Sequence, residues 1–142
     1  MKAYLDTSFL VSLYSLDANS RPAARTVSRR SLEYLITPLT ELEMANALEL
    51  RVHRKEISRL EANASWEAFA RDSGEGIWTI RPLTDQMFAR ALKLSQQTTA
   101  RLGTRSADLL HVAAALELGC VMLCSFDRRQ RALAHDVGLK LN

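Results

Sequence analysis

Short apolar segments alternate along this chain with longer segments in which apolar residues recur every three to four positions. The short segments lie at about residues 2–6, 34–37, 77–81 and 121–126, with a weaker one at 139–141. Alternating strand and helix signals favour an α/β fold, in which helices pack on both faces of a parallel sheet. The sequence therefore predicts a three-layer α/β/α architecture around a mostly parallel central sheet of four to five strands.

The longer segments predict the helices that connect these strands. They lie at about residues 8–16, 21–33, 40–53, 56–72, 85–98, 105–118 and 128–136. Local signals mark some of their ends: a capping-box pattern runs from Thr40 to Glu43, and Gly119 follows the helix that begins near Ser106. Because no repeat, low-complexity segment or interdomain linker interrupts the pattern, we expect one domain over residues 1–142.

The composition is ordinary for a soluble globular protein, with 47% apolar and 25% charged residues in a chain of 142. No apolar run reaches about 18 residues, the length that indicates a membrane-spanning helix, and the N-terminus lacks the apolar segment of a signal peptide. We therefore expect a cytoplasmic protein that does not enter a membrane. Cys120 and Cys124 have no histidine or further cysteine at metal-ligand spacing, so we expect buried free thiols.

The net charge of +3 and the isoelectric point of about 9.1 permit a polyanionic partner without requiring one. The basic residues form three groups, which are Arg21, Arg25, Arg29 and Arg30; Arg51, Arg54 and Lys55; and Arg128, Arg129 and Arg131. Each group fits a solvent-exposed helix face. Basic groups beside an acidic pocket are also what the binding of a phosphate backbone requires.

Two aspartates lie at the carboxyl ends of predicted strands. Asp6 ends the first strand segment, and Asp127 follows the segment at 121–126. Because ligands of an open α/β sheet collect outside the carboxyl ends of its strands, both side chains can point into one cleft. Glu43 and Asp108 lie near the starts of two predicted helices. These four carboxylates are the candidate catalytic residues.

Carboxylates held close together repel one another and resist joint ionisation unless a cation neutralises them. Without such a cation, we expect their pKa values to be raised. Hard carboxylate oxygens suit Mg²⁺ or Mn²⁺, which keep bound waters for chemistry on phosphates. The sequence therefore predicts a Mg²⁺ or Mn²⁺ site formed by Asp6, Glu43, Asp108 and Asp127.

Each acid also has a structural explanation. Asp6 can cap a helix, and Asp127 can occupy a turn. The helix dipole favours a carboxylate at Asp108 in any protein, because that residue lies in a first helical turn. Glu43 can reach back to complete a capping box. Only their occurrence together makes a shared site the better interpretation.

The helix that contains Glu43 can aim only one of its two early glutamates at the cleft. Glu41 lies about 200° around the helix axis from Glu43, whereas Asn46 follows Glu43 by one turn on the same face. We therefore expect Glu43 to face the site with Asn46 in support. The hydroxyls of Ser8 and Ser125 either support the acids in the same way or belong to ordinary loop serines.

The histidines do not indicate a metal-free ribonuclease. His53, His111 and His135 show no arrangement that would form an acid–base pair. His111 lies between Leu110 and Val112, so we expect a packed core histidine. The sequence therefore favours a mechanism that needs a metal ion and no histidine.

Two other classes of protein with strand-end aspartates fit less well. A phosphoacceptor signalling domain needs a second acid beside the first and a lysine after a late strand, and the residues around Asp6 and Asp127 provide neither. A haloacid-dehalogenase-like phosphatase needs an aspartate two residues after its nucleophile, where this chain has Ser8. The presence of all four acids also disfavours a degraded, non-catalytic module.

Four segments around the acids carry a resemblance to a known family. They are Tyr4-Leu-Asp6-Thr-Ser-Phe-Leu-Val, Thr40-Glu-Leu-Glu43-Met-Ala-Asn46-Ala-Leu, Arg105-Ser-Ala-Asp108-Leu-Leu-His-Val-Ala-Ala-Ala and Cys124-Ser125-Phe-Asp127-Arg-Arg-Gln-Arg-Ala-Leu-Ala. In order and spacing they resemble the PIN-domain ribonucleases, most of all the VapC-type toxins of bacterial and archaeal toxin–antitoxin pairs. By this resemblance the four acids take the family's acidic positions, with Asn46 and Ser125 near them, and Ser125 stands where the family often has threonine.

The resemblance implies a Mg²⁺- or Mn²⁺-dependent endoribonuclease that hydrolyses RNA phosphodiester bonds. It also implies a homodimer and a cognate antitoxin whose C-terminal segment occupies the active-site groove. The bound metal ions polarise the phosphate and activate water in such a mechanism. The alternatives are a PIN nuclease of RNA processing outside a toxin–antitoxin pair, and a non-catalytic interaction module on the same fold.

Overall fold

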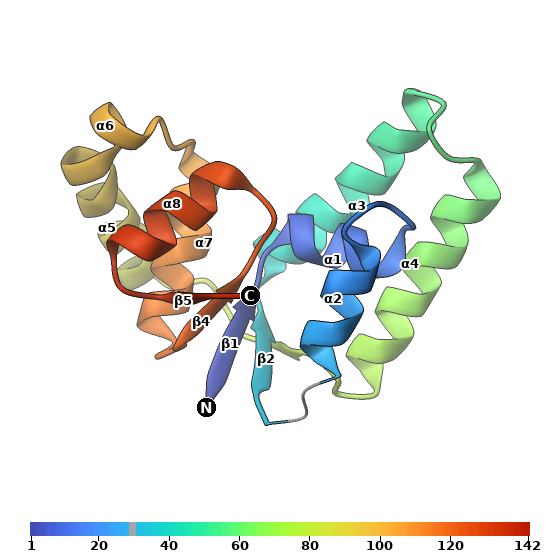
Figure 1. The fold of residues 1–142 in the computed structure, drawn as a ribbon, viewed down its shortest axis with the longest axis horizontal. Helices are drawn as coiled ribbons and strands as arrows, with labels where there is room; N and C mark the ends of the chain where they lie inside the picture. Colours follow the sequence, from blue (N-terminus) through green and yellow to red (C-terminus); the bar gives the residue numbers. More distant parts are fainter. Residues whose placement is uncertain (29–30) are drawn as a thin grey trace.

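A single parallel sheet forms the centre of the molecule (Figure 1). The computed structural model describes residues 1–28 and 31–142, and within them the sheet has five strands in the order β3-β2-β1-β4-β5. The strands are β1 (Lys2–Leu5), β2 (Glu33–Ile36), β3 (Thr79–Ile80), β4 (Met122–Cys124) and β5 (Lys140–Leu141). All neighbouring strands pair in parallel, so the predicted sheet is confirmed, including its weak fifth strand.

Helices connect the strands, and all but the short one at 100–102 lie near the places that the sequence predicts. They are α1 (Thr7–Tyr14), α2 (Ser20–Val27), α3 (Pro38–His53), α4 (Arg59–Gly74), α5 (Asp85–Leu94), α6 (Ala100–Leu102), α7 (Ser106–Glu117) and α8 (Arg128–Asp136), with a π-helical segment, η1 (Ser95–Thr99), between α5 and α6. The predicted helix at 21–33 is too long, because β2 already begins at Glu33. Arg29 and Arg30, which were expected on that helix, lie outside the described residues.

The start of α3 differs from the prediction in a way that affects the site. Thr37 is the N-cap, and Pro38 takes the first helical position, where a missing N–H costs nothing. The Thr37 N–H donates to Thr40 Oγ1 at 3.4 Å. The predicted capping box from Thr40 to Glu43 is therefore wrong, because the helix begins earlier than expected. The Glu43 carboxylate is consequently not used at the helix start.

Helices cover both faces of the sheet, which confirms the three-layer architecture. In β1, β2 and β4, alternate side chains enter one of two buried apolar clusters. Tyr4 and Leu123 belong to the cluster packed against α5, α7 and α8, whereas Leu5 and Cys124 belong to the one against α1 to α4 (Figure 1). Burial of each large apolar side chain contributes about 1.5–3 kcal/mol, so the two clusters hold the strands in register.

The strand order reverses direction at β1, which lies between β2 and β4. The Asp6 N–H donates to the Cys124 carbonyl at 3.1 Å and fixes the ends of β1 and β4 beside each other. Ligands of doubly wound sheets bind in the crevice outside such a reversal point. The fold therefore places the residues after β1 and β4 where a site is expected.

Two further predictions concern the rest of the chain. Cys120 and Cys124 are buried free thiols, as expected. Within the described residues, each helix is too short or too polar to span a bilayer.

Candidate active site

A small polar pocket lies outside the carboxyl ends of β1 and β4. Its volume is about 240 Å³, and it is lined by Asp6, Thr7, Ser8, Glu43, Arg105, Ala107, Asp108, Asp127 and Gln130. The structure therefore brings all four candidate acids to one place. Glu41 is not part of the lining, and Glu43, on the same helix, is. The acids come from the end of β1, from α3, from α7 and from the residue before α8.

Asp6 is fully buried and held by hydrogen bonds on both carboxylate oxygens. Its Oδ1 accepts the Phe9 N–H at 3.0 Å, which makes it the N-cap of α1. The Ser8 hydroxyl donates to Oδ1 at 2.8 Å, and the Ser125 hydroxyl donates to Oδ2 at 2.9 Å. Burial raises the pKa of Asp6, and the charge of His111 and these hydrogen bonds offset it only in part.

Ser8 and Ser125 also join the segments that follow β1 and β4. Ser8 Oγ accepts the Phe126 N–H at 2.9 Å, and Ser125 Oγ accepts the Asp127 N–H at 3.0 Å. Each hydroxyl thus donates a hydrogen bond to Asp6 and accepts one from a backbone N–H of the segment that follows β4. The structure favours the supporting role for both serines over that of ordinary loop residues.

Glu43 is half-buried and contacts two side chains that the sequence did not assign to it. The Thr7 hydroxyl donates to Glu43 Oε1 at 2.9 Å, and His111 Nε2 is hydrogen-bonded to the same oxygen. Burial alone would raise the pKa of Glu43, but the hydrogen bond and charge of His111, with the Thr7 hydroxyl, lower it overall. Glu43 is therefore stabilised as a carboxylate, contrary to the expectation that all four pKa values are raised.

His111 connects Glu43 to a buried hydroxyl network. It is fully buried, as expected, but its Nδ1 lies 2.9 Å from the Tyr4 hydroxyl oxygen. That hydroxyl lies 3.0 Å from Thr37 Oγ1 and 3.2 Å from Thr40 Oγ1 at the start of α3. Both imidazole nitrogens thus have partners, and the ring orientation is fixed. The histidine holds the carboxylate rather than only filling the core.

Asn46 does not take the supporting role that the helix spacing suggested. It is exposed on α3, and in the described part of the chain no hydrogen bond joins it to Glu43. Thr7 and His111 support the glutamate instead. Spacing on one helix face could not show the contacts that other elements make with Glu43.

Asp108 is 1% exposed and combines capping with contacts to the pocket. Its Oδ2 accepts the Arg105 N–H at 2.9 Å at the start of α7. The Arg105 guanidinium lies 3.3 Å from Oδ2 through Nε and 3.4 Å from Oδ1 through Nη2. Gln130 Nε2 donates to Oδ1 at 3.3 Å. The structural and functional explanations of Asp108 are therefore compatible.

Asp127 is the N-cap of α8 and faces the pocket with its second oxygen. Its Oδ1 accepts the backbone N–H groups of Arg129 and Gln130, each at 2.9 Å. Its Oδ2 lies 3.4 Å from Arg105 Nη2. The same guanidinium thus bridges Asp108 and Asp127, two acids that approach the pocket from different helices.

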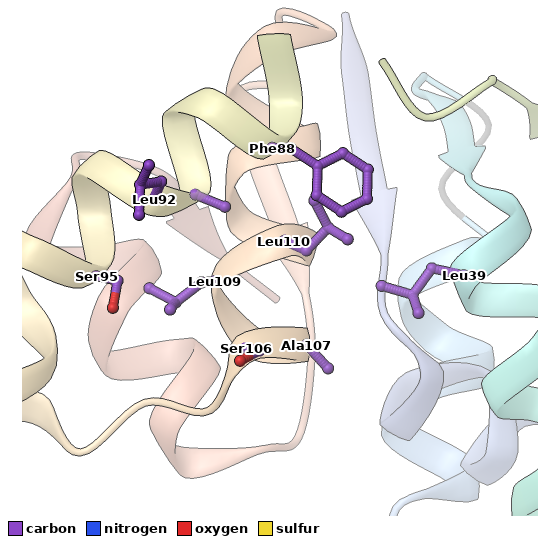
Figure 2. A pocket seen from close by; sticks show the side chains of 9 residues that line it. Leu39, Phe88, Leu92, Ser95, Ser106, Ala107, Leu109 and Leu110 are labelled. Atoms are coloured by element: carbon purple, nitrogen blue, oxygen red, sulfur yellow. The ribbon is translucent and has the colours of Figure 1, made fainter. Parts of the chain in front are cut away.

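A larger pocket next to this one has a different character. Its volume is about 440 Å³, and its lining is largely apolar. Figure 2 shows Leu39 of α3 pointing towards Phe88 of α5 and Leu110 of α7 across this space. Ala107 lines both pockets, so they adjoin. The described residues that line the apolar pocket include no carboxylate, histidine or cation for chemistry, and the acidic pocket is the candidate active site.

The comparison with protein families agrees with this fold. The family model described as PIN domain matches residues 3–136. The chain belongs to the PIN domain family. No curated protein sequence matches the chain. The family expected from the four sequence segments is thus confirmed.

Several solved structures share the PIN fold of this chain. The Mycobacterium tuberculosis toxin VapC20, described as cleaving the sarcin-ricin loop, is 18% identical with a TM-score of 0.69, and the match covers 92% of this chain and 93% of VapC20. A chain of Rickettsia felis VapBC2 bound to promoter DNA is 13% identical with a TM-score of 0.70, covering 100% and 98%. A chain of Neisseria gonorrhoeae FitAcB is 15% identical with a TM-score of 0.66, covering 98% and 95%.

The acidic pocket of this PIN domain fits a divalent cation by the chemistry of its donors, because four carboxylates supply hard oxygen ligands. As the side chains stand, no three acidic, histidine or cysteine residues among those described are placed to share one metal ion. Arg105 and the helix caps occupy several of the carboxylate oxygens. Metal binding therefore requires these contacts to rearrange.

Four residues that contact the acids were not assigned to the site from the sequence, namely Thr7, Arg105, His111 and Gln130. A usable signal existed for two of them. Arg105 precedes Asp108 by three residues and His111 follows it by three, a spacing at which side chains in and next to a helix can meet. The partner of His111 on α3 could not be read from that spacing.

Proposed function

We propose that this chain, with residues 1–142 as one PIN domain, is a Mg²⁺- or Mn²⁺-dependent endoribonuclease that hydrolyses RNA phosphodiester bonds. The observation that carries the proposal is the convergence of four acids on one open pocket at the carboxyl ends of β1 and β4. Helix capping accounts for each of the three aspartates separately. It does not account for Glu43, or for all four side chains lining the same space.

Glu43 has a carboxylate oxygen available for proton transfer. Both of its hydrogen bonds end on Oε1, and Oε2 has no hydrogen-bond partner among the described residues. We assign Oε2 as the acceptor of the proton from the attacking water. The lowered pKa of Glu43 keeps this group ionised for that purpose.

The aspartates would hold the divalent cation. Asp6, Asp108 and Asp127 each present a carboxylate to the pocket. When bound, Mg²⁺ or Mn²⁺ polarises the phosphate and makes water easier to deprotonate. The hydroxyls of Ser8 and Ser125 keep Asp6 oriented for this role.

An RNA backbone is the substrate that the surroundings of the pocket suit. Arg128 and Arg129 are exposed on the first turn of α8, directly after Asp127. Cationic side chains beside a metal site bind the phosphates on either side of the scissile bond. Such contacts read the backbone and not the bases, so they favour a nucleic-acid substrate without fixing its sequence.

We further propose that the enzyme is a VapC-like toxin that acts in the cytoplasm as a homodimer and is inhibited by a cognate antitoxin. The four-segment resemblance supports this role, and the similar solved structures include one entitled a toxin–antitoxin complex, from Klebsiella pneumoniae. A small protein encoded beside this chain should copurify with it and block RNA cleavage. Light scattering of the purified toxin should give twice the mass of 15.9 kDa.

Metal dependence tests the proposed activity. Purified protein should cleave RNA with Mg²⁺ or Mn²⁺, lose that activity in EDTA, and regain it when the metal is restored. Asp6→Asn should remain folded and inactive, and it serves as the control for contaminating ribonuclease. Full cleavage in EDTA would contradict the mechanism. Absence of cleavage with either metal, in a folded protein, would favour the non-catalytic interaction module.

A further inference from the structure

Among the described residues, Arg105 is the one basic residue that lines the acidic pocket. We propose that its guanidinium is the resident cation of the metal-free pocket, and that a divalent metal ion displaces it from Asp108 and Asp127. This inference rests on the proposed function, because it takes the pocket to be a metal site. It adds a competition between a side chain of the protein and the metal for the same carboxylates.

The guanidinium occupies the oxygens that a metal ion would need. Asp127 Oδ1 is committed to the cap of α8, and the remaining oxygen, Oδ2, lies 3.4 Å from Arg105 Nη2. The same Nη2 lies 3.4 Å from Asp108 Oδ1. A metal ion that binds Asp108 and Asp127 together must therefore take the place of Arg105.

The contacts of the guanidinium are suited to exchange. Its three distances to carboxylate oxygens are 3.3, 3.4 and 3.4 Å, longer than the roughly 2.7–2.9 Å of strong charged hydrogen bonds. The Arg105 side chain is 63% exposed, so it can move into solvent. The backbone N–H of Arg105 stays on Asp108 Oδ2 at 2.9 Å, and α7 keeps its cap when the side chain leaves.

The charges of the pocket favour such a resident cation. Four carboxylates in one small space repel unless a positive group lies among them. The hydrogen bonds and charge of Asp108 raise the pKa of Arg105, with further contributions from the charges of Asp127 and Glu43. The guanidinium thus neutralises part of the carboxylate charge, a role that was expected to require a metal ion.

Mn²⁺ binding without RNA tests the inference, because it needs no catalysis. Arg105→Gln should bind Mn²⁺ about 3- to 10-fold more tightly than wild type in calorimetric or paramagnetic resonance titrations, the range expected when two exposed ion pairs no longer compete. Arg101→Gln is the matched control, since Arg101 has a similarly exposed side chain and pairs with Asp136 at 3.0 Å outside the pocket. Its Mn²⁺ affinity should equal that of wild type.

Thermal melting gives a second readout. In EDTA, Arg105→Gln should melt below wild type, because the acids lose their cation, and saturating Mn²⁺ should remove the difference. Arg105→Lys keeps the charge but cannot bridge two carboxylates, so its Mn²⁺ affinity should lie between those of Gln and wild type. This variant decides the question if Arg105→Gln does not fold.

Equal or weaker Mn²⁺ binding by the Arg105 variants would overturn the inference while leaving the proposed nuclease intact. Weaker binding would show that Arg105 orients Asp108 for the metal. If wild type binds no Mn²⁺ at all, the metal site itself fails and this inference fails with it. Metal-dependent RNA cleavage, measured separately, distinguishes these two failures.

Discussion

The two sides of the acidic pocket hold their carboxylates by different chemistry. On the side of β1 and α3, side-chain hydroxyls and His111 hold Asp6 and Glu43. On the side of α7 and α8, the Arg105 guanidinium and backbone N–H groups hold the other two aspartates. The contacts of the first side that are given above measure 2.8–3.0 Å, whereas the second side combines backbone N–H contacts of 2.9 Å with longer contacts to an exposed guanidinium.

This difference separates carboxylates with fixed hydrogen-bond partners from carboxylates whose bound cation can be exchanged. Among the described residues no basic side chain forms an ion pair with Asp6, and the charge of His111 offsets its burial only in part, so its pKa is raised. Asp108 is equally buried, but an arginine beside it supplies the charge. The pocket can therefore hold four acids without a metal ion because a basic side chain lies near the carboxylates on each side.

The largest expected effect distinguishes Glu43 from its neighbour on the same helix. Glu43→Gln should lower RNA cleavage by at least about 10²-fold, because it removes a positioned proton acceptor. Glu41→Gln, which changes the same charge outside the pocket lining, should change cleavage little. The measurement is kcat/KM on a defined RNA with saturating Mg²⁺. The reverse ranking would show that the wrong face of α3 has been assigned to the site.

A smaller loss should follow from removing the support of Glu43. His111→Leu should lower kcat roughly 10-fold with little change in KM, the size typical for groups that orient a catalytic ligand. His111→Gln should recover most of kcat, since its amide N–H can still donate to Glu43. Both variants should be compared at temperatures where circular dichroism shows them folded. Equal losses in the two variants would mean that His111 only fills the core.

Metal-free stability should respond in opposite directions on the two sides. In EDTA at neutral pH, Asp6→Asn should raise the melting temperature by about 3 °C, because it removes a buried charge that has no cation bound to it. Asp108→Asn should lower it by a similar amount, because it breaks the contact with Arg105. The general repulsion expected from the sequence would stabilise both variants instead. Calorimetry of the three proteins decides between these outcomes.

The smallest effects concern the pH dependence of those stabilities. Burial raises the pKa of Asp6 in the folded protein above its value in the unfolded chain. The protonated form of Asp6 therefore contributes fully to the free energy of unfolding below the unfolded-chain pKa, and this contribution is lost as pH rises through the folded-state pKa. The pKa of Glu43 is lower in the folded protein than in the unfolded chain. Its carboxylate therefore contributes to the free energy of unfolding above the unfolded-chain pKa, and this contribution is lost as pH falls through the folded-state pKa. In EDTA, the advantage of Asp6→Asn over wild type should therefore grow as pH rises from about 4 to 7.

The same titration should give the opposite trend for Glu43→Gln. The melting temperature of Glu43→Gln should lie furthest below that of wild type at neutral pH. The difference should disappear in acid, where the wild-type glutamate is protonated. Melting curves in EDTA across this range measure both variants. Parallel curves for the two would show that neither side chain has a shifted pKa.

Local sequence signals were sufficient for the strands, for most of the helices apart from their ends, and for the meeting of the acids. Strand-end positions predicted Asp6 and Asp127 together, because parallel strands end at one edge of a sheet. The contact between His111 and Glu43 could not be predicted, since it joins residues of two helices that are 68 positions apart in the chain. The start of α3 was misassigned because both Thr37 and Thr40 suit a helix cap.

The hydrogen bond from Ser125 to Asp6 spans 119 positions of the chain. A ribosome releases Asp6 early, yet the hydroxyl that orients it, and then Asp127, emerge only after most of the protein has been made. The first acid is therefore in place long before its last partners exist. An incomplete chain therefore lacks a complete pocket. Order of synthesis alone thus delays the proposed nuclease activity until nearly the whole domain has left the ribosome.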